Sequence, residues 1–272
     1  MRVLYVGDVV GRSGRTILLA RIGEMRERLR LDALVVNGEN AAAGFGITGR
    51  ICDEFLAAGV DVVTTGNHVW DQKDAVAYIA QQPRLIRPLN MQPGTPGAGT
   101  VELRTARGQR LVVMQAMGRL FMKPLDDPFR AVERELQRWR LGRSCDAILV
   151  DIHAEATSEK TSFGHFLDGH VSLVAGTHTH VPTADARILP GGTGYITDVG
   201  MTGDYDSVIG MDKLNALARW RHDTPQPKLE PALGEGTLCA VYLETDDETG
   251  LARRVEPLRI GARLAETWPE VS

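Results

Sequence analysis

Short apolar runs alternate with longer amphipathic segments along the first part of the chain. Five runs read as buried strands, at residues 2–6, 33–36, 60–65, 147–152 and 171–175. Between the first three runs, residues 16–30 and 49–58 have the spacing of helices, and Thr48 stands in the position of an N-cap. The front of the chain therefore predicts a βαβαβ order.

The rest of the chain mixes helices with hairpins. Helices are expected at residues 71–82, 127–141 and 207–220, and further strands at residues 100–105, 109–115, 237–244 and 253–260. Pro83 would stop the first of these helices, and Gly210 weakens the last. This order predicts an α/β protein, a four-layer α-β-β-α sandwich of two mixed sheets with outer helices.

Composition narrows the class of protein. With 272 residues and 43% hydrophobic content, the chain can bury a large core. Its net charge of -4 gives no reason to expect nucleic acid as a broad electrostatic partner. Three scattered cysteines suggest no disulfide framework, and no apolar run approaches the length of a membrane span or a signal peptide. We expect a cytoplasmic protein without membrane association.

Side chains able to bind metal follow each of the five strands. They are Asp8, Glu39 with Asn40, Asn67 with His68, His153, and His178 with His180. Any one of them could be a helix cap, a turn residue or a core histidine. Five such groups at equivalent strand ends instead indicate two or more cations. Imidazole combined with carboxylate and amide oxygens suits iron, manganese, zinc or cobalt.

The spacing of the last two histidines leaves two arrangements open. On a continuing strand, His178 and His180 would share a face and one metal, whereas a turn would aim them at two different metals. Glu39 is the candidate for a carboxylate that bridges two cations, with Asp8 as its competitor among the motif carboxylates. Two metals about 3.5–4 Å apart are the arrangement that cleaves phosphate esters.

These motifs together resemble those of the calcineurin-like metallophosphoesterases, and most closely their YmdB branch. The resemblance rests on Gly7-Asp8-Val9-Val10-Gly11, Asn37-Gly38-Glu39-Asn40-Ala41, Thr65-Gly66-Asn67-His68-Val69-Trp70-Asp71, His153-Ala154-Glu155-Ala156-Thr157-Ser158-Glu159-Lys160 and Thr197-Asp198-Val199-Gly200-Met201-Thr202-Gly203. Val10 stands where the wider superfamily has a second metal-binding residue. In this branch, the resemblance implies that Asn40 supplies the missing ligand and that Glu39 replaces the usual bridging aspartate.

The resemblance also implies a cofactor and a ligand set. It implies two divalent or trivalent transition-metal ions, with iron or manganese expected, in a single metallophosphoesterase domain that spans residues 1–272. One metal would be held by Asp8, Glu39, Asn40 and His180. The other would be held by Glu39, Asn67, His153 and His178. The loop at residues 93–99 is not a domain boundary on this interpretation, because ligands lie on both sides of it.

The implied function is that of a phosphodiesterase acting on a small nucleotide, with 2′,3′-cyclic AMP as the expected type of substrate. The reaction would be metal-hydroxide attack on phosphorus, with His68 as the general acid that protonates the departing ribose oxygen. His68 could instead only hydrogen-bond the substrate or a ligand. A phosphomonoesterase such as a nucleotidase, or a non-catalytic metal-bound regulatory protein, are the alternatives.

Several assignments stay open at this point. Arg12 and Arg15 either contact phosphate or form the solvated face of the first helix. Asp198 and Thr202 either shape a substrate pocket or belong to an ordinary turn. Glu155 and Lys160 are equally undecided. The sequence does not choose between iron and manganese, between a monomer and a homo-oligomer, or between catalysis and regulation as the biological role.

Overall fold

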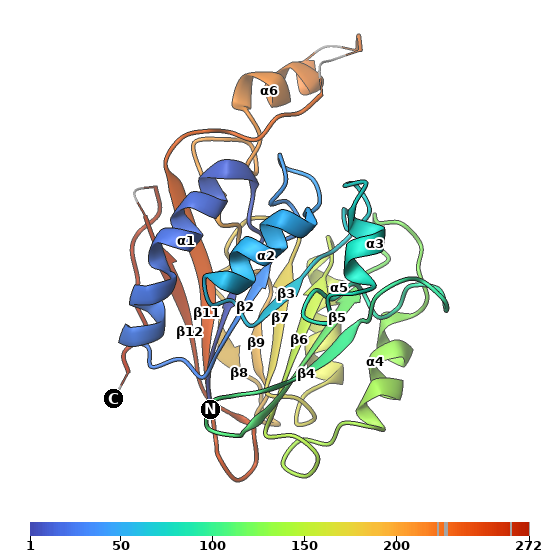
Figure 1. Cartoon of the computed structure of the whole chain (residues 1–272), viewed down its shortest axis with the longest axis vertical. Helices are drawn as coiled ribbons and strands as arrows, with labels where there is room; N and C mark the ends of the chain where they lie inside the picture. The colour runs from blue at the N-terminus through green and yellow to red at the C-terminus, as the bar shows by residue number, and fades with distance from the viewer. Residues whose placement is uncertain (222, 226–227, 262, 272) are drawn as a thin grey trace.

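The computed structural model of the chain describes residues 1–272 except 222, 226, 227, 262 and 272 (Figure 1). The helices are α1 Gly11–Arg28, α2 Gly49–Ala57, α3 Ala75–Ile79, α4 Pro128–Leu136, α5 Thr157–Phe166 and α6 Lys213–Arg221. The strands are β1 Arg2–Val6, β2 Ala33–Asn37, β3 Val62–Thr64, β4 Thr100–Arg104, β5 Arg110–Met117, β6 Ala147–His153, β7 Leu173–Thr177, β8 Arg187–Ile188, β9 Gly194–Ile196, β10 Gly203–Asp204, β11 Gly236–Thr245 and β12 Ala252–Ile260.

Within the described residues, these strands form two mixed sheets. One has the order β10-β11-β1-β2-β3, with β12 paired to β11, and the other has the order β4-β5-β6-β7-β9-β8. Strands β1, β2 and β3 run parallel in the first sheet, as do β5, β6, β7 and β9 in the second. The parallel strands of each sheet therefore end at a common edge, where their following loops lie together.

Alternate side chains of the central strands serve different layers of the molecule. In β1, Val3 and Tyr5 pack in the core between the sheets, whereas Leu4 and Val6 face the helices outside the first sheet. Strand β6 alternates in the same way between the inner core and the layer beneath α4 and α5. Helices α1 and α2 lie over the first sheet and α4 over the second (Figure 1). The predicted four-layer sandwich is confirmed.

The predicted strands are confirmed with shifts of one or two residues at their ends, but three helix starts were wrong, those of α1, α3 and α6. Helix α1 begins at Gly11 rather than at residue 16. Its first turn is poor in helix-forming residues, yet the Ser13 hydroxyl anchors it by donating to the Gly234 carbonyl oxygen at 2.7 Å. Helix α6 begins at Lys213 rather than at residue 207, because Gly210 has φ +95° and lies in a turn.

Helix α3 is shorter than the predicted segment 71–82, because Asp71 and Gln72 make hydrogen bonds outside the helix. The Asp71 carboxylate lies 2.7 Å from the ring of His68, and the Gln72 amide donates to the Phe45 carbonyl oxygen at 2.6 Å. Helix α4 likewise ends at Leu136, five residues before the predicted end at 141. Thr48 caps α2 as predicted, since its hydroxyl oxygen accepts from the Ile51 amide at 3.3 Å.

Helix α5 was not predicted at all. Its sequence alternates polar and small residues with few apolar positions, so it carries no clear helical periodicity. One of its inward-facing side chains is Lys160, which is fully buried. Because a lysine is normally interpreted as a surface residue, the pattern of buried positions in α5 could not be recognised from the sequence.

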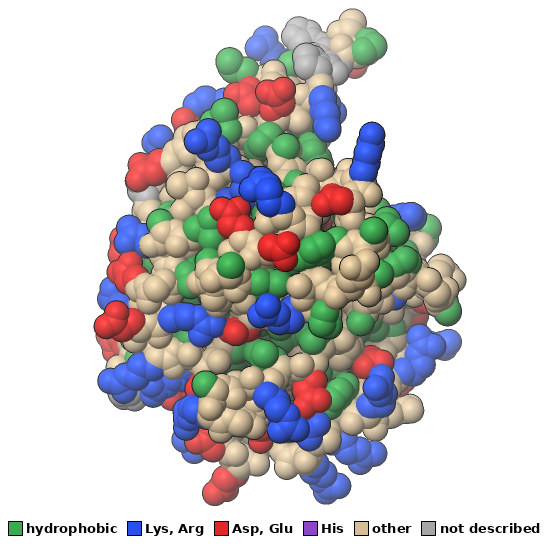
Figure 2. All heavy atoms as spheres, viewed as in Figure 1, with side chains coloured by type: hydrophobic (Ala, Val, Ile, Leu, Met, Phe, Trp, Pro, Cys, Tyr) green, Lys and Arg blue, Asp and Glu red, His purple; other side chains and the backbone are tan. Residues whose placement is uncertain are grey.

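The surface has no single-sign character on the face that Figure 2 displays. Basic and acidic side chains are interspersed there over the whole outline, including the part over α1 and α2. In the part of the chain that the structure describes, no helix combines the length and the apolar content that crossing a membrane requires.

Candidate dinuclear metal centre

The predicted site residues gather where the parallel strands of both sheets end. The loops after β1, β2 and β3 and the ends of β6 and β7 bring together Asp8, Glu39, Asn40, Asn67, His153, His178 and His180. They form two neighbouring groups of atoms with different surroundings.

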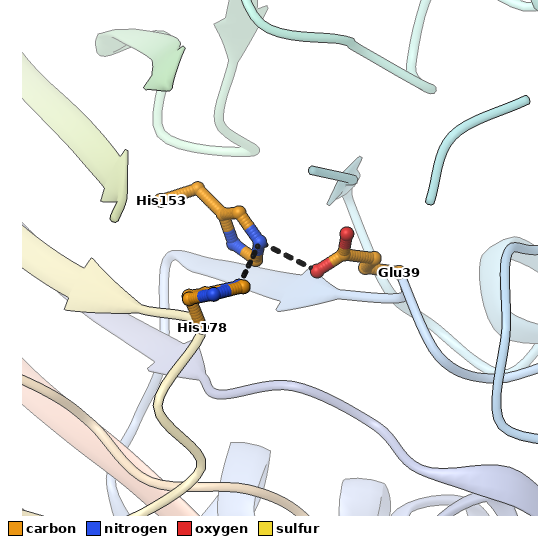
Figure 3. A group of neighbouring side chains, drawn as sticks. All are labelled: Glu39, His153 and His178. Carbon is orange, nitrogen blue, oxygen red and sulfur yellow. Dashed lines mark hydrogen bonds and ion pairs between the residues drawn. The ribbon is translucent and has the colours of Figure 1, made fainter. Parts of the chain in front are cut away.

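The first group converges on Nε2 of His153, which is fully buried. Within hydrogen-bond reach of this nitrogen lie Oε2 of Glu39 at 2.7 Å, Oδ1 of Asn67 at 3.0 Å and Nδ1 of His178 at 3.1 Å. Figure 3 shows Glu39 and His178 pointing at His153 from different loops. One ring nitrogen carries at most one proton, so it cannot satisfy three such neighbours. Four converging atoms with lone pairs fit a bound cation.

The second group contains buried oxygens without hydrogen-bond partners among the described residues. Oδ1 of Asp8 and Oδ1 of Asn40 accept no hydrogen bond from any described residue, although both side chains are buried. The Asn40 amide nitrogen donates to the Gly44 carbonyl oxygen at 3.0 Å, which fixes the direction of Oδ1. Nε2 of His180 lies 4.0 Å from Oδ1 of Asp8. Buried unsatisfied oxygens are costly, and a cation would satisfy both.

Glu39 belongs to the first group and directly precedes Asn40 of the second in the sequence. Its Oε2 faces His153, its Oε1 accepts the backbone N–H of His68 at 2.7 Å, and it lines the same cavity as Asn40. Gly66 makes room for it, because a Cβ at that position would lie 2.5 Å from Nε2 of His153 and 2.6 Å from Cδ of Glu39. A side chain at position 66 would therefore displace His153 or Glu39.

The two closely spaced histidines lie in a turn. Strand β7 ends at Thr177, and His178 and His180 have φ of 96° and 65°, values that residues other than glycine rarely adopt. As a result, Nδ1 of His178 faces His153, whereas Nε2 of His180 faces Asp8. Of the two arrangements that the sequence left open, the structure has the turn, with each histidine in a different group.

A buried ion pair holds this turn. Oδ2 of Asp198 accepts the backbone N–H of Thr179 at 3.1 Å and its hydroxyl at 2.8 Å, and also lies 2.7 Å from Nζ of Lys160. Both charged side chains are buried. Strained backbone persists where its surroundings fix it, and here Asp198 fixes the residue between the two histidines. Asp198 and Lys160, both undecided from the sequence, thus support the site.

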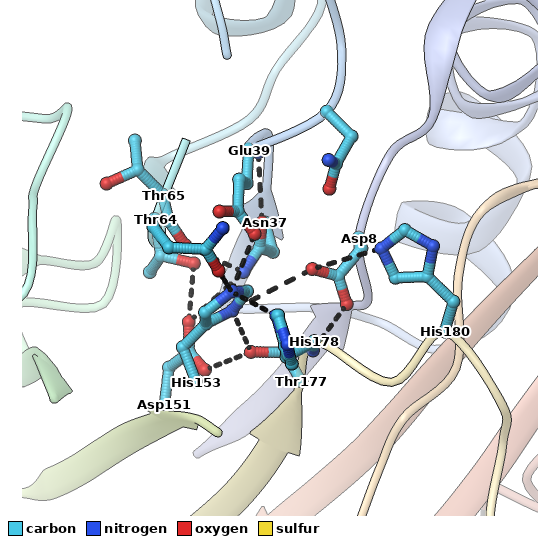
Figure 4. A network of polar contacts seen from close by, with 12 residues as sticks. Asp8, Asn37, Glu39, Thr64, Thr65, Asp151, His153, Thr177, His178 and His180 are labelled. Atoms are coloured by element: carbon cyan, nitrogen blue, oxygen red, sulfur yellow. Dashed lines mark hydrogen bonds and ion pairs between the residues drawn. The ribbon is translucent and has the colours of Figure 1, made fainter. Parts of the chain in front are cut away.

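A chain of hydrogen bonds backs His153. Its Nδ1 lies 2.9 Å from the Thr177 hydroxyl, which donates to Oδ1 of Asp151 at 2.7 Å (Figure 4). Oδ2 of Asp151 in turn accepts from Thr64 at 2.9 Å and from the Gln115 amide at 2.8 Å. The buried Asp151 therefore joins both sheets beneath the site and leaves Nε2 of His153 as the atom facing the first group.

The other two histidines have partners of the same kind. Nε2 of His178 lies 3.2 Å from the Glu155 carboxylate, and Nδ1 of His180 lies 2.7 Å from the carbonyl oxygen of Ile209. A proton held on those nitrogens leaves the opposite ring nitrogen with a lone pair for a metal. Glu155 and Ile209 were not among the predicted site residues. The signal for Glu155 was its place two residues after His153, whereas nothing in the sequence pointed to Ile209.

Burial and neighbouring charges shift the pKa values of the cluster. Burial raises the pKa of Asp8 to about 6, although the charges of His180 and His153 oppose the shift. Burial also acts on Glu39 and His153, but their mutual attraction outweighs it, lowering the pKa of Glu39 to about 2 and raising that of His153 to about 9. The metal-free cluster therefore holds a proton on His153 at neutral pH, where a cation would replace it.

His68 stands beside both groups, on the wall of a cavity of about 340 Å³ that Glu39, Asn40, His178 and His180 also line. Its side chain is 30% exposed, and its Nδ1 lies 2.7 Å from Oδ2 of Asp71. The Asp71 carboxylate can accept a proton held on Nδ1, which fixes the orientation of the His68 ring. Sequence reasoning missed this role of Asp71, although its spacing three residues after His68 within one motif was the available signal.

Two of the remaining open residues, Arg15 and Thr202, donate hydrogen bonds to backbone carbonyl oxygens. The Arg15 guanidinium donates to the carbonyl oxygen of Ala41, and the exposed Arg12 lines a different hollow next to Ser13 and Gly234. The Thr202 amide donates to the carbonyl oxygen of Asp8 at 2.8 Å. Arg15 and Thr202 therefore position the loops that carry Asn40 and Asp8.

Comparison with known proteins points to one family. A family model described as YmdB-like protein matches residues 4–258. The chain is 42% identical over 260 residues, covering 96% of this chain and 97% of the relative, to a Bacillus subtilis protein named 2′,3′-cyclic-nucleotide 2′-phosphodiesterase. A crystal structure of a hypothetical protein from Thermus thermophilus has 45% identity and a TM-score of 0.89, covering 96% of this chain and 99% of that one.

A more distant structure extends the likeness to the fold. The calcineurin-like phosphoesterase YfkN from Bacillus subtilis has 12% identity and a TM-score of 0.58, covering 96% of this chain and 90% of that one. The two sheets with outer helices are thus a calcineurin-like phosphoesterase fold. Because the family model matches nearly the whole chain and the Bacillus subtilis relative aligns along 96% of it, the chain belongs to the YmdB-like family.

Proposed function

We propose that this protein is a dinuclear-metal phosphodiesterase that opens 2′,3′-cyclic nucleotides. The observation that carries the proposal is the pair of adjacent atom groups around Glu39, one crowded with lone pairs and one with unpartnered buried oxygens, next to His68 in one cavity. The substrate class follows from the name of the Bacillus subtilis relative. Iron or manganese fits the mixture of imidazole, carboxylate and amide donors.

The two groups divide the ligands between two metals. One metal would be held by Asp8, Glu39, Asn40 and His180. The other would be held by Glu39, Asn67, His153 and His178. Bound cations would supply charge neutralisation at phosphorus and an activated water molecule as the nucleophile. Because these ligands come from both sheets, we also propose that residues 1–272 act as one domain. We propose the cytoplasm as the location of the protein.

His68 is the proton donor in this proposal. Its Nδ1 faces Asp71, so its Nε2 is the nitrogen free to carry the proton that is delivered. The attacking water loses one proton to solvent as its oxygen adds to phosphorus; the bond between phosphorus and one ribose oxygen breaks, and that oxygen takes the proton from His68, which then regains a proton from solvent. The product is a nucleoside monophosphate with an open ribose diol. The Glu39 carboxylate accepts the backbone N–H of His68 at 2.7 Å and so holds that backbone beside the first ligand group.

A substrate panel tests the proposal. Manganese-loaded and chelator-treated protein is incubated with 2′,3′-cyclic AMP, with 3′-AMP and with 2′-AMP, and the products are separated by chromatography. The proposal predicts chelator-sensitive conversion of the cyclic diester to a single AMP isomer, with adenosine formed slowly or not at all. Release of adenosine from the monoesters without opening of the ring would instead identify a phosphomonoesterase.

A further inference from the structure

We propose that Phe45 and Ile209 form a subsite for the nucleobase of the substrate, built on the loop that carries Asn40 and on the loop that hydrogen-bonds His180. This inference rests on the proposed function and extends it to substrate recognition. The cavity that contains His68 has one polar side made of the cluster residues. The apolar part of its lining consists of Phe45, Ile209, Met211 and Leu229. A metal centre alone has no need of such a wall.

The loop around Phe45 is preorganised. Gly44 and Gly46 flank it with φ of 85° and 73°, which reverses the chain on both sides of the aromatic residue. The Phe45 amide donates to the Ala42 carbonyl oxygen at 3.0 Å, and its own carbonyl oxygen accepts from Gln72. Since the Gly44 carbonyl oxygen also accepts from the Asn40 side chain, this loop places an aromatic ring and a metal ligand together.

Ile209 reaches the cavity from the opposite part of the chain. Its φ is 46°, a conformation that is strained for a β-branched residue. Its carbonyl oxygen accepts from Nδ1 of His180, while its side chain is 52% exposed beside the cavity. Strain of this kind points to function where the surroundings maintain it. Here one residue both orients a histidine and presents an apolar branch to the substrate.

The position of Phe45 indicates which part of the substrate lies against it. Its ring packs edge-on against the His68 ring, with centroids 5.1 Å apart and planes at 72°. His68 faces the departing ribose oxygen in the proposed reaction, so the ribose and its base extend from that side. The Lys228 ammonium lies 5.5 Å from the centroid of the Phe45 ring, on a long, exposed side chain that a stacked base would displace.

The chemistry of the wall predicts weak discrimination among bases. Phe45 and Ile209 offer no hydrogen-bonding side-chain atoms, and stacking on an aromatic ring accepts every base because each has a π-face. The inferred ligand is therefore a 2′,3′-cyclic nucleotide of any base, in preference to a cyclic phosphate that has no base.

The experiment compares two substrates on manganese-loaded protein. They are 2′,3′-cyclic AMP and 1-O-methylribose 2′,3′-cyclic phosphate, which lacks the base. Phe45→Ala is expected to lower kcat/KM for the nucleotide about tenfold, mainly through KM, and to change the base-free substrate less than about twofold. Phe45→Tyr, which keeps the ring, should retain wild-type discrimination. Phe121→Ala is the matched control, because Phe121 is 91% exposed and is not among the described residues that line the cavity.

A second measurement separates recognition from damage to the metal centre. Adenosine, which has no phosphate, should inhibit turnover of the base-free substrate by wild type and inhibit Phe45→Ala about tenfold less. Metal content should be equal in both proteins. Equal losses on both substrates, or unchanged adenosine inhibition, would overturn the inference. If wild type opens neither cyclic phosphate, the proposed function fails first, whereas equal turnover of both substrates by wild type leaves that function standing and refutes only the base subsite.

Discussion

At the scale of single residues, each site histidine uses its two ring nitrogens differently. One nitrogen of His153, His178 and His180 faces the cluster, and the other faces Thr177, Glu155 or Ile209. The ligand types were predictable from the sequence because they follow apolar runs directly. Their partners were not, because they come from other loops and differ in chemistry: a hydroxyl, a carboxylate and a backbone carbonyl.

Removing the hydroxyl behind His153 tests the importance of these partners. Thr177→Val keeps the shape of the side chain but removes the link to Asp151, so we expect metal affinity to fall about 10- to 100-fold. Thr177→Ser keeps the hydroxyl and should bind metal nearly as wild type does. Calorimetric titration with manganese measures both variants. Equal affinity of the valine variant and wild type would show that the hydrogen-bonded chain does not orient His153.

His68 is predicted to donate a proton to the leaving ribose oxygen and to bind neither metal. His68→Ala should lower kcat for 2′,3′-cyclic AMP by about 10²- to 10⁴-fold, because the leaving oxygen loses its proton donor. Metal content per chain should stay the same, since the His68 side chain contacts Asp71 and Phe45 and is not one of the proposed ligands. Elemental analysis combined with steady-state kinetics checks both statements. Full retained activity would remove His68 as the acid.

At the scale of elements, hydrophobic patterning identified the strands because alternate residues must face two different cores. It failed for α5 and for the start of α1, where packing and buried polar contacts override weak helical propensity. The turn after β7 could not be predicted either. Its positive φ values depend on Asp198, which lies eighteen residues beyond His180 in the sequence.

The buried ion pair gives a test at this scale. Lys160→Met leaves the Asp198 carboxylate buried without its cation, so the free energy of unfolding should fall by about 3–5 kcal/mol. Adding Asp198→Asn should recover part of that loss, because the amide is neutral and still accepts from Thr179. Urea unfolding of both variants gives the comparison. If the Lys160→Met variant is as stable as wild type, the ion pair does not anchor the turn.

At the scale of the whole molecule, the candidate metal centre connects the two sheets. Asp8, Glu39 and Asn67 follow strands of one sheet, whereas His153 and His178 belong to the end of the other. The layered architecture was predictable from the order of elements. The pairing of β11 between β1 and β10 was not, because a C-terminal strand entering beside the first strand leaves no local signal.

Metal binding should therefore stabilise the entire fold. Manganese at 100 times its Kd should raise the free energy of unfolding by about 2.7 kcal/mol per bound site, and a chelator should remove the gain. Glu39→Gln should show a much smaller increase, because in the proposed centre both sites would lose their shared carboxylate. Thermal unfolding with and without manganese provides the measurement. A stability that does not depend on metal in wild type would indicate that the cluster binds none in the native state.

The most direct test of the central claim is anomalous diffraction from crystals of manganese-loaded protein. We predict two anomalous peaks about 3.5–4 Å apart, with a carboxylate oxygen of Glu39 touching both. One peak should lie against Asp8, Asn40 and His180, and the other against Asn67, His153 and His178. A single peak, or none in crystals grown with excess manganese, would contradict the dinuclear centre and the function proposed from it.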